Sequence, residues 1–227
     1  MMKGISVLFE DDKLLCLNKP AGLSVQGGAG VETSLDSLLF KEYKNPPLLV
    51  HRLDKDTSGI IVTAKTRESA AACSALFAGH KSGLKKTYLA ACGGIPEKEG
   101  TIEESLIIKG RKLEAKTAYF LLASVSGRDS SGISLLQLEP ATGRMHQIRR
   151  HLAQSGFPVL GDDKYGDFSL NKKLRKQCGL KRLLLHAYSL YLPPPLIKGG
   201  LLLSAPLPDH FLDFLKKTGL PAARDGG

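Results

Sequence analysis

The chain has 227 residues with 42% hydrophobic and 24% charged side chains, which suits one large soluble domain and provides no run long enough to span a membrane. The formal net charge of +10 favours polyanionic partners such as nucleic acids, although a merely soluble cationic protein has the same composition. Four scattered cysteines without a C-x-x-C pair, and an N-terminus without a signal peptide, indicate a reducing cytoplasm and argue against structural zinc or disulfides.

The first segment of the chain predicts a strand, a tight turn and a second strand over residues 7–17. A Gly-rich loop follows at residues 27–30, and Thr33 can cap a short helix that carries three leucines. Two prolines at 46 and 47 end this helix before a strand at residues 48–50.

Residues 51–59 read His-Arg-Leu-Asp-Lys-Asp-Thr-Ser-Gly and are the most informative segment. In an extended chain, residues two apart share a face, so Arg52 and Asp54 project together while Leu53 turns towards the core. The pattern predicts a cation and a carboxylate directed into one site, ahead of an apolar strand at residues 60–62.

The middle of the chain predicts an Ala-rich helix over residues 67–80 and then several strands. The strands are expected at residues 85–92, which include Tyr88, and at 102–108, 116–125 and 133–138. Strand signals recur without regular βαβ alternation, so we expect an α+β fold with a mixed, largely antiparallel sheet and flanking helices.

A helix is expected from Thr142 to Gly156, with Met145, Ile148, Arg149 and Leu152 on one face. An arginine on an apolar face requires a carboxylate partner, because burying an unpaired guanidinium is costly. Asp54 is the first candidate for this partner, and a purely structural pairing with Asp162 or Asp163 is the alternative.

The segment 172–182 contains only basic charged residues, among them Lys172, Lys173 and Arg175. It is predicted to be a loop, either one that binds phosphates or a solvated cationic loop. A strand at residues 183–192 and a short helix within residues 206–220 complete the expected fold.

Residues 51–59 and the segment 142–152, Thr-Gly-Arg-Met-His-Gln-Ile-Arg-Arg-His-Leu, closely resemble the two long motifs of the RluA-type pseudouridine synthases. The resemblance implies that Asp54 is the catalytic residue, that Arg149 forms an ion pair with it, and that Tyr88, in a K-x-Y-L-A strand, lies against the target base. It also implies that Arg52 occupies the space that the flipped uridine leaves.

Weaker matches at residues 19–22, 185–187 and 205–208 extend the resemblance in family order. Met145 replaces a small hydroxyl residue of the family and Arg150 replaces a common valine, which can alter RNA contacts. Further RNA contacts are expected from five residues: Arg144, His146, Lys172, Lys173 and Arg175.

The resemblance further implies a single pseudouridine synthase catalytic domain over residues 1–227, without the N-terminal S4-type domain that many relatives carry. We expect a monomer. No cofactor or metal is expected, because isomerising uridine exchanges no electrons or atoms with other molecules. Residues 25–30 are similar to members that act on large-subunit ribosomal RNA, so ribosomal RNA is expected before tRNA.

Two other classes of enzyme fit the sequence poorly. The Asp56-Thr57-Ser58-Gly59 turn is similar to that of aspartic proteases, but the chain has one such turn and those enzymes need two carboxylates. A zinc hydrolase is disfavoured because His146 and His151 are five residues apart. A catalytically silent RNA-binding protein of the same fold is the serious alternative, although both Asp54 and Arg149 are present.

Overall fold

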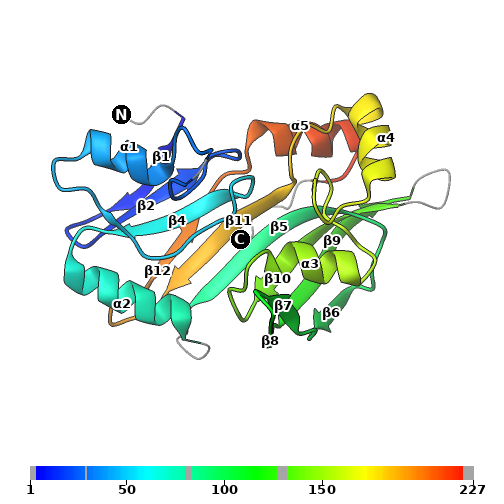
Figure 1. Ribbon diagram of the computed structural model, residues 1–227. Coiled ribbons are helices and arrows are strands. Elements are labelled where there is room, and N and C mark those ends of the chain that lie inside the picture. The colour runs from blue at the N-terminus through cyan, green and yellow to red at the C-terminus, as the bar shows by residue number, and fades with distance from the viewer. Residues whose placement is uncertain (1–3, 29, 80–82, 127–131, 222–227) are drawn as a thin grey trace. The chain divides into compact units, whose positions relative to one another are not determined.

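The computed structural model describes residues 4–28, 30–79, 83–126 and 132–221, and Figure 1 shows the arrangement of its elements. The chain forms two compact units, each built from two segments. Unit 1 comprises Met1–Lys86 and Ala187–Pro206, and unit 2 comprises Thr87–His186 and Leu207–Gly227. Helices and largely antiparallel strands confirm the predicted α+β class.

Unit 1 contains a strand order β1-β2-β4-β11, in which β3 pairs with β4 and β12 with β11. The predicted first hairpin is confirmed, since β1 and β2 pair antiparallel. Asp11 Oδ1 fixes its turn by accepting hydrogen bonds from the amides of Lys13 and Leu14 at 2.8 and 2.6 Å. The strands are β1 (Ser6–Glu10), β2 (Leu14–Lys19), β3 (Leu48–Leu49), β4 (Ser58–Ala64), β11 (Leu185–Leu192) and β12 (Leu201–Ser204).

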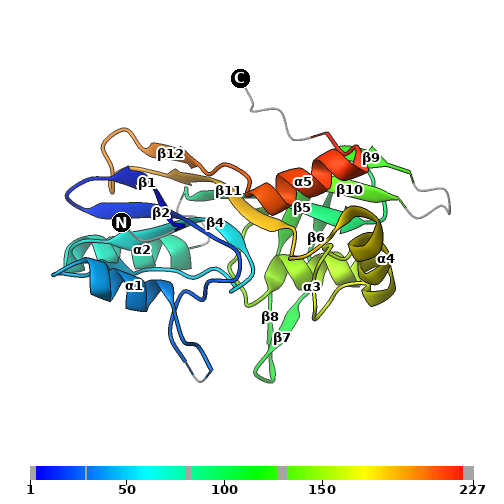
Figure 2. The ribbon, with the colours of Figure 1, turned by 90° about the horizontal axis from the view of Figure 1, so that it is seen from above.

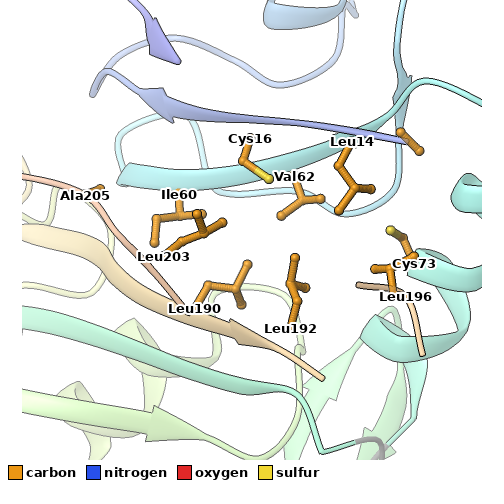
Figure 3. Packing of buried hydrophobic residues seen from close by; sticks show 11 residues of the cluster. Leu14, Cys16, Ile60, Val62, Cys73, Leu190, Leu192, Leu196, Leu203 and Ala205 are labelled. Carbon is orange, nitrogen blue, oxygen red and sulfur yellow. The ribbon is translucent and has the colours of Figure 1, made fainter. Parts of the chain in front are cut away.

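The core of unit 1 is centred on β4, in which every residue is buried. Its apolar side chains pack with those of β2, β11 and β12, and Cys73 joins them from the neighbouring helix (Figure 3). The labelled cluster is Leu14, Cys16, Ile60, Val62, Cys73, Leu190, Leu192, Leu196, Leu203 and Ala205. Strand β4 follows directly on residues 51–57, the loop that carries Asp54, so this core fixes one end of that loop.

Both helices of unit 1 begin with capping boxes. Helix α1 (Leu35–Glu42) is capped by Ser34, so the prediction that Thr33 is the cap was wrong by one residue. Helix α2 (Arg67–Ala78) is capped by Thr66 and confirms the predicted helix from residue 67, but it ends at Ala78 because Gly79 is an extended C-cap; His80 lies outside the described residues.

Unit 2 contains four antiparallel strands in the order β5-β10-β9-β6 and a separate β7–β8 hairpin. The single strand predicted at 102–108 was wrong, because the exposed Glu103 and Glu104 lie between the sheet and the hairpin. The bounds are β5 (Lys85–Gly93), β6 (Glu99–Ile102), β7 (Leu106–Ile108), β8 (Arg111–Leu113), β9 (Thr117–Val125) and β10 (Ile133–Pro140).

Both faces of the unit 2 sheet are covered, because alternate residues of β5 contribute to two different apolar clusters. Ala90 and Cys92 pack with Ile148 and Leu152 of helix α3 (Gln147–Gln154). Ala91 packs in the second cluster, with residues of α4 (Phe168–Cys178) and α5 (Asp209–Thr218). The helix predicted within residues 206–220 is therefore confirmed as α5.

Helix α3 begins later than predicted. Thr142 was expected to start it, but the Oε1 of Gln147 accepts hydrogen bonds from the Thr142 hydroxyl and the Arg144 amide, which holds this segment in a turn. His146 adopts the left-handed conformation with φ 54°, and Gln147 is the first helical residue. Met145 is consequently 45% exposed and does not belong to the buried helical face.

The basic segment was predicted to be a loop, but Lys172, Lys173 and Arg175 lie on helix α4. Asp167 caps this helix by accepting a hydrogen bond from the Leu170 amide at 2.9 Å. The basic side chains are exposed, because buried Asn171 and Leu174 form the inner face of α4. None of the helices in the described part of the chain has both the length and the apolar character needed to cross a bilayer.

Candidate active site

The Asp54 loop, residues 51–57, connects β3 to β4 without being a strand itself. Leu53 is 6% exposed, which confirms that it turns inward, whereas Arg52 is exposed and Asp54 half-buried. The expected extended conformation is interrupted by a turn, in which the Thr57 amide donates to the Asp54 carbonyl at 3.2 Å. The loop therefore presents a cation and a carboxylate at the surface of unit 1.

His51 anchors the beginning of the Asp54 loop. Its ring stacks on Phe77 of α2 with centroids 3.9 Å apart, and its Nε2 accepts a hydrogen bond from the Val62 amide at 2.8 Å. Burial, aided by the nearby Lys86 cation, lowers the pKa of His51 to about 3. The imidazole is therefore neutral, as an acceptor of an amide proton must be.

Lys19 anchors the middle of the Asp54 loop, a role that the sequence did not predict. Its side chain is fully buried, and Nζ donates to the carbonyls of Pro20, Leu23 and Lys55 at 2.9, 2.8 and 3.0 Å. Burial lowers the pKa of Lys19 to about 8, while the carboxylates of Asp56 and Asp54 oppose this shift. In the sequence, Lys19 was marked only as the first residue of the weak match at 19–22, at the end of an apolar strand.

Gly59 fixes the end of the same loop. Its φ of +108° disfavours any other residue, and a Cβ at this position would lie 2.2 Å from the Ala187 carbonyl oxygen of β11. The glycine of the motif is thus required by the close approach of two backbones.

In unit 2, Arg149 is 6% exposed and forms a two-pronged ion pair with Asp162. Its Nε and Nη2 donate to the two carboxylate oxygens at 2.7 Å each, and Asp163 Oδ1 lies 3.5 Å from Nη2. Asp162, the alternative partner considered from the sequence, therefore does pair with Arg149. The pairing with Asp54, which belongs to unit 1, stays a prediction.

Asp162 is held by more than its arginine. Its Oδ1 also accepts hydrogen bonds from the amides of Lys164 and Tyr165 at 2.9 and 3.0 Å. Burial acts to raise the pKa of Asp162, but Arg149 and the two amides outweigh it and keep the pKa below the ordinary value. Asp162 is therefore charged and fixes the orientation of the Arg149 guanidinium.

His146 and Tyr165 contact each other close to this arginine. The Nδ1 of His146 is 3.0 Å from the Tyr165 hydroxyl, and Arg149 Cζ is 5.3 Å from the centre of the Tyr165 ring. Tyr165 belongs to residues 161–166, which continue the resemblance after the second motif, but the sequence predicted no role for it. The structure gives it a contact with two predicted site residues.

The remaining predicted residues of unit 2 have different surroundings. Tyr88 is a half-buried residue of β5 and packs against the apolar cluster that contains Ile148. Arg144 is not simply a solvated cation, because its Nε donates to the Glu114 carbonyl at 3.2 Å.

Cys16 and Cys73 are not activated nucleophiles. Burial is the main cause that raises the pKa of Cys16 to about 12 and that of Cys73 to about 11. Among the residues that the structure describes, no three His, Cys, Asp or Glu side chains are grouped so as to hold a metal ion.

Comparisons with known proteins show the family of the chain. The model of the family described as RNA pseudouridylate synthase matches residues 13–154. "Ribosomal large subunit pseudouridine synthase C" of Rickettsia prowazekii is 37% identical, over 90% of this chain and 69% of that protein. "tRNA pseudouridine synthase C" of Haemophilus ducreyi is 33% identical, over 92% of this chain and 98% of that protein.

Solved structures show the same fold. The human protein titled "RNA Pseudouridylate Synthase Domain Containing 4" superposes with a TM-score of 0.79 at 28% identity, covering 96% of this chain and 95% of the other.

Proposed function

The chain belongs to the RNA pseudouridylate synthase family, and we propose that it is an RluA-type enzyme that isomerises uridine to pseudouridine with Asp54 as its catalytic carboxylate. The observation that carries this assignment is the Asp54 loop. Its carboxylate is half-buried rather than enclosed, while His51, Lys19 and Gly59 fix the backbone on both sides of it. A reactive group that is accessible and rigidly placed is what catalysis by positioning requires.

The reaction moves the glycosidic bond of one nucleotide. The bond from C1′ to the uracil nitrogen breaks, the base turns, and C5 of the base bonds to C1′ while its proton is released to the vacated nitrogen through solvent or a side chain. Asp54 either attacks C1′ or abstracts the C2′ proton to give a glycal. Each role requires an ionised carboxylate.

Arg149 is proposed as the cation that pairs with Asp54. A guanidinium has five N–H donors and can serve more than one carboxylate, as the positions of Asp162, at 2.7 Å, and Asp163, 3.5 Å from Nη2, illustrate. In this proposal Asp162 acts as a positioning residue, because it holds the guanidinium in one orientation before RNA binds.

Two further residues are proposed to handle the flipped base. A uridine inside a helix cannot be reached, so it must leave the stack, which costs a few kcal/mol. Arg52, exposed on the Asp54 loop, would occupy the vacated space, and Tyr88, half-buried in β5, would lie against the uracil. His146 would add an RNA contact, as would the exposed Lys172, Lys173 and Arg175 of α4.

Large-subunit ribosomal RNA is the proposed substrate and tRNA the alternative. Relatives with either name are similar to this chain at 37% and 33% identity, so the choice rests on residues 25–30. We further propose that the protein acts as a monomer in the cytoplasm, with residues 1–227 as one catalytic domain. Mapping pseudouridine in both RNAs, from cells with and without the gene, tests the choice; loss of a tRNA site with intact ribosomal RNA would overturn it.

Replacing Asp54 by asparagine tests the catalytic assignment. The change removes the charge and keeps the shape, so pseudouridine formation should fall by on the order of 10⁴-fold while the Kd for RNA is retained. Asp213→Asn, at an exposed position of α5, is the matched control and should keep full activity. Turnover of Asp54→Asn equal to that of the control would refute the role of Asp54, and a silent RNA-binding protein would show no turnover even in the wild type.

A further inference from the structure

The β7–β8 hairpin is a small arm that stands apart from the sheet of unit 2 (Figure 2). Lys109 and Gly110 form its two-residue turn with φ of 49° and 75°, and the flanking pair is Ile108 with Arg111. Two successive left-handed residues define a tight hairpin turn that matches the twist of the strands. The tip is therefore a defined structure.

The tip of this arm is strongly cationic. Lys109, Arg111 and Lys112 are all exposed, and no acidic residue lies between Glu104 and Glu114. Ile107, opposite Lys112 in the strand register, is 65% exposed. Lys112 shares a face of the ribbon with Ile107, and Arg111 projects from the opposite face, so the tip is positively charged on both faces and favours a polyanion.

The arm is held at its edges by two arginines of the second motif. Arg150 Nη1 donates to the Ile107 carbonyl at 3.0 Å, and Arg144 Nε donates to the Glu114 carbonyl at 3.2 Å. In a two-residue hairpin, every second pair of residues directs its carbonyls away from the partner strand. The arginines thus satisfy carbonyls that the hairpin itself cannot pair.

Two more side chains of the same segment hold the base of the arm. His151 Nε2 donates to the Glu104 carbonyl and Gln147 Nε2 to the Lys116 carbonyl, each at 2.9 Å. An isolated two-stranded hairpin is only marginally stable in water, so these contacts keep the arm in place. They come from the segment that also carries Arg149.

We propose that Lys109, Arg111, Lys112 and Ile107 form a surface that binds the phosphate backbone of the substrate RNA. This inference rests on the proposed function, which makes RNA the polyanion. A preformed arm pays little ordering cost on binding, so its charges contribute fully to affinity. Arg150, which replaces the valine common in the family, acts in this chain as one of the supports of the arm.

The experiment is RNA binding by the combined variant Lys109→Asn, Arg111→Gln and Lys112→Gln. Asn-Gly is a favoured sequence for this turn, so the fold of the arm is retained. Binding is measured at several salt concentrations, with large-subunit ribosomal RNA from cells lacking the gene as the probe. The slope of log K against log salt should become shallower by about 2 to 3, because each lost phosphate contact removes about 0.7 to 0.9.

The matched control removes three exposed lysines elsewhere, Lys41→Gln, Lys44→Gln and Lys98→Gln, and should leave the slope unchanged. Equal slopes for the wild type and the arm variant, or equal losses in arm and control variants, would overturn the proposal. Because binding is read without turnover, a wild type that binds RNA but forms no pseudouridine contradicts the proposed function and leaves this inference standing.

Arg150→Val supplies a second test that keeps all three tip charges. It should increase amide hydrogen exchange in residues 106–113 and weaken RNA binding without changing the salt slope. Unchanged exchange and unchanged affinity would show that the arm does not depend on this support, and would count against a preformed binding surface.

Discussion

The Asp54 loop of unit 1 and the Arg149 region of unit 2 hold their charged groups by different means. The loop is fixed through its backbone, by a neutral imidazole and a buried ammonium that contact main-chain groups, while the Asp54 side chain stays half-exposed. Arg149 is fixed through its own charge by a fully buried carboxylate. In the proposed mechanism, this difference leaves the reactive carboxylate accessible and orients its supporting cation in advance.

The largest expected effect comes from removing the carboxylate that orients Arg149. Asp162→Ala leaves a buried guanidinium without its strongest partner, so the free energy of unfolding should fall by about 3–5 kcal/mol. Denaturant unfolding measures the loss. Asp163→Ala is the matched control, because that side chain is 85% exposed and 3.5 Å from the same arginine, and it should have little effect. Similar losses for both variants would show that orientation by Asp162 is not specific.

A smaller loss is expected on the other side of the comparison. Lys19→Met keeps the aliphatic stem but leaves the buried carbonyls of Pro20, Leu23 and Lys55 without their donor, at a cost of about 2–3 kcal/mol. The exposed Lys13→Met is the control. Because Lys19 positions the loop rather than touching RNA, kcat should fall while the Kd for RNA is retained. A Lys19→Met enzyme with normal kcat would contradict the positioning role.

The third effect depends on pH. The pKa of His51 is about 3 in the folded protein and ordinarily about 6.5, so the unfolded chain binds the extra proton between these values. Stability contributed by neutral His51 is therefore complete above pH 6.5 and is lost as the pH falls towards 3. At pH 5 the loss is about 2 kcal/mol, following the linkage of about 1.4 kcal/mol per pH unit.

Urea unfolding at pH 7 and pH 5, in the wild type and in His51→Asn, measures this term. The wild type should lose more stability between the two pH values than the variant, because other titrating groups are common to both. An identical pH dependence would mean that the neutral imidazole does not stabilise the loop.

Local patterns predicted what local interactions decide. Leu53 is buried as alternation required, and helix α2 follows the Ala-rich segment from Arg67. Helix α3 was misplaced because Gln147 captures Thr142 and Arg144 in a turn, a side-chain contact that periodicity does not encode. The helical nature of α4 was not predicted because its buried face, Asn171 and Leu174, contains one apolar residue and gives little hydrophobic periodicity.

The supports of the candidate site could not be predicted in the same way. The Lys19 side chain bonds to the carbonyl of Lys55, 36 residues away, and no pattern within either segment marks that contact. The motif resemblance indicated Asp54 and Arg149 because both residues lie within the two long motifs, at 51–59 and 142–152. The helix-face argument, and not the resemblance, named Asp162 as one possible acid, and neither identified it as the group that orients Arg149.

Unit 1 is built from two segments that lie far apart in the sequence, and this constrains when it can fold during synthesis. Residues 51–59 leave the ribosome early, yet the core beneath them needs Leu190, Leu192 and Leu203 from the last part of the sequence. During synthesis, the apolar core that supports the Asp54 loop therefore stays incomplete until translation is nearly finished. A nascent chain stalled before residue 187 should be unable to complete unit 1, however well its earlier segments are formed.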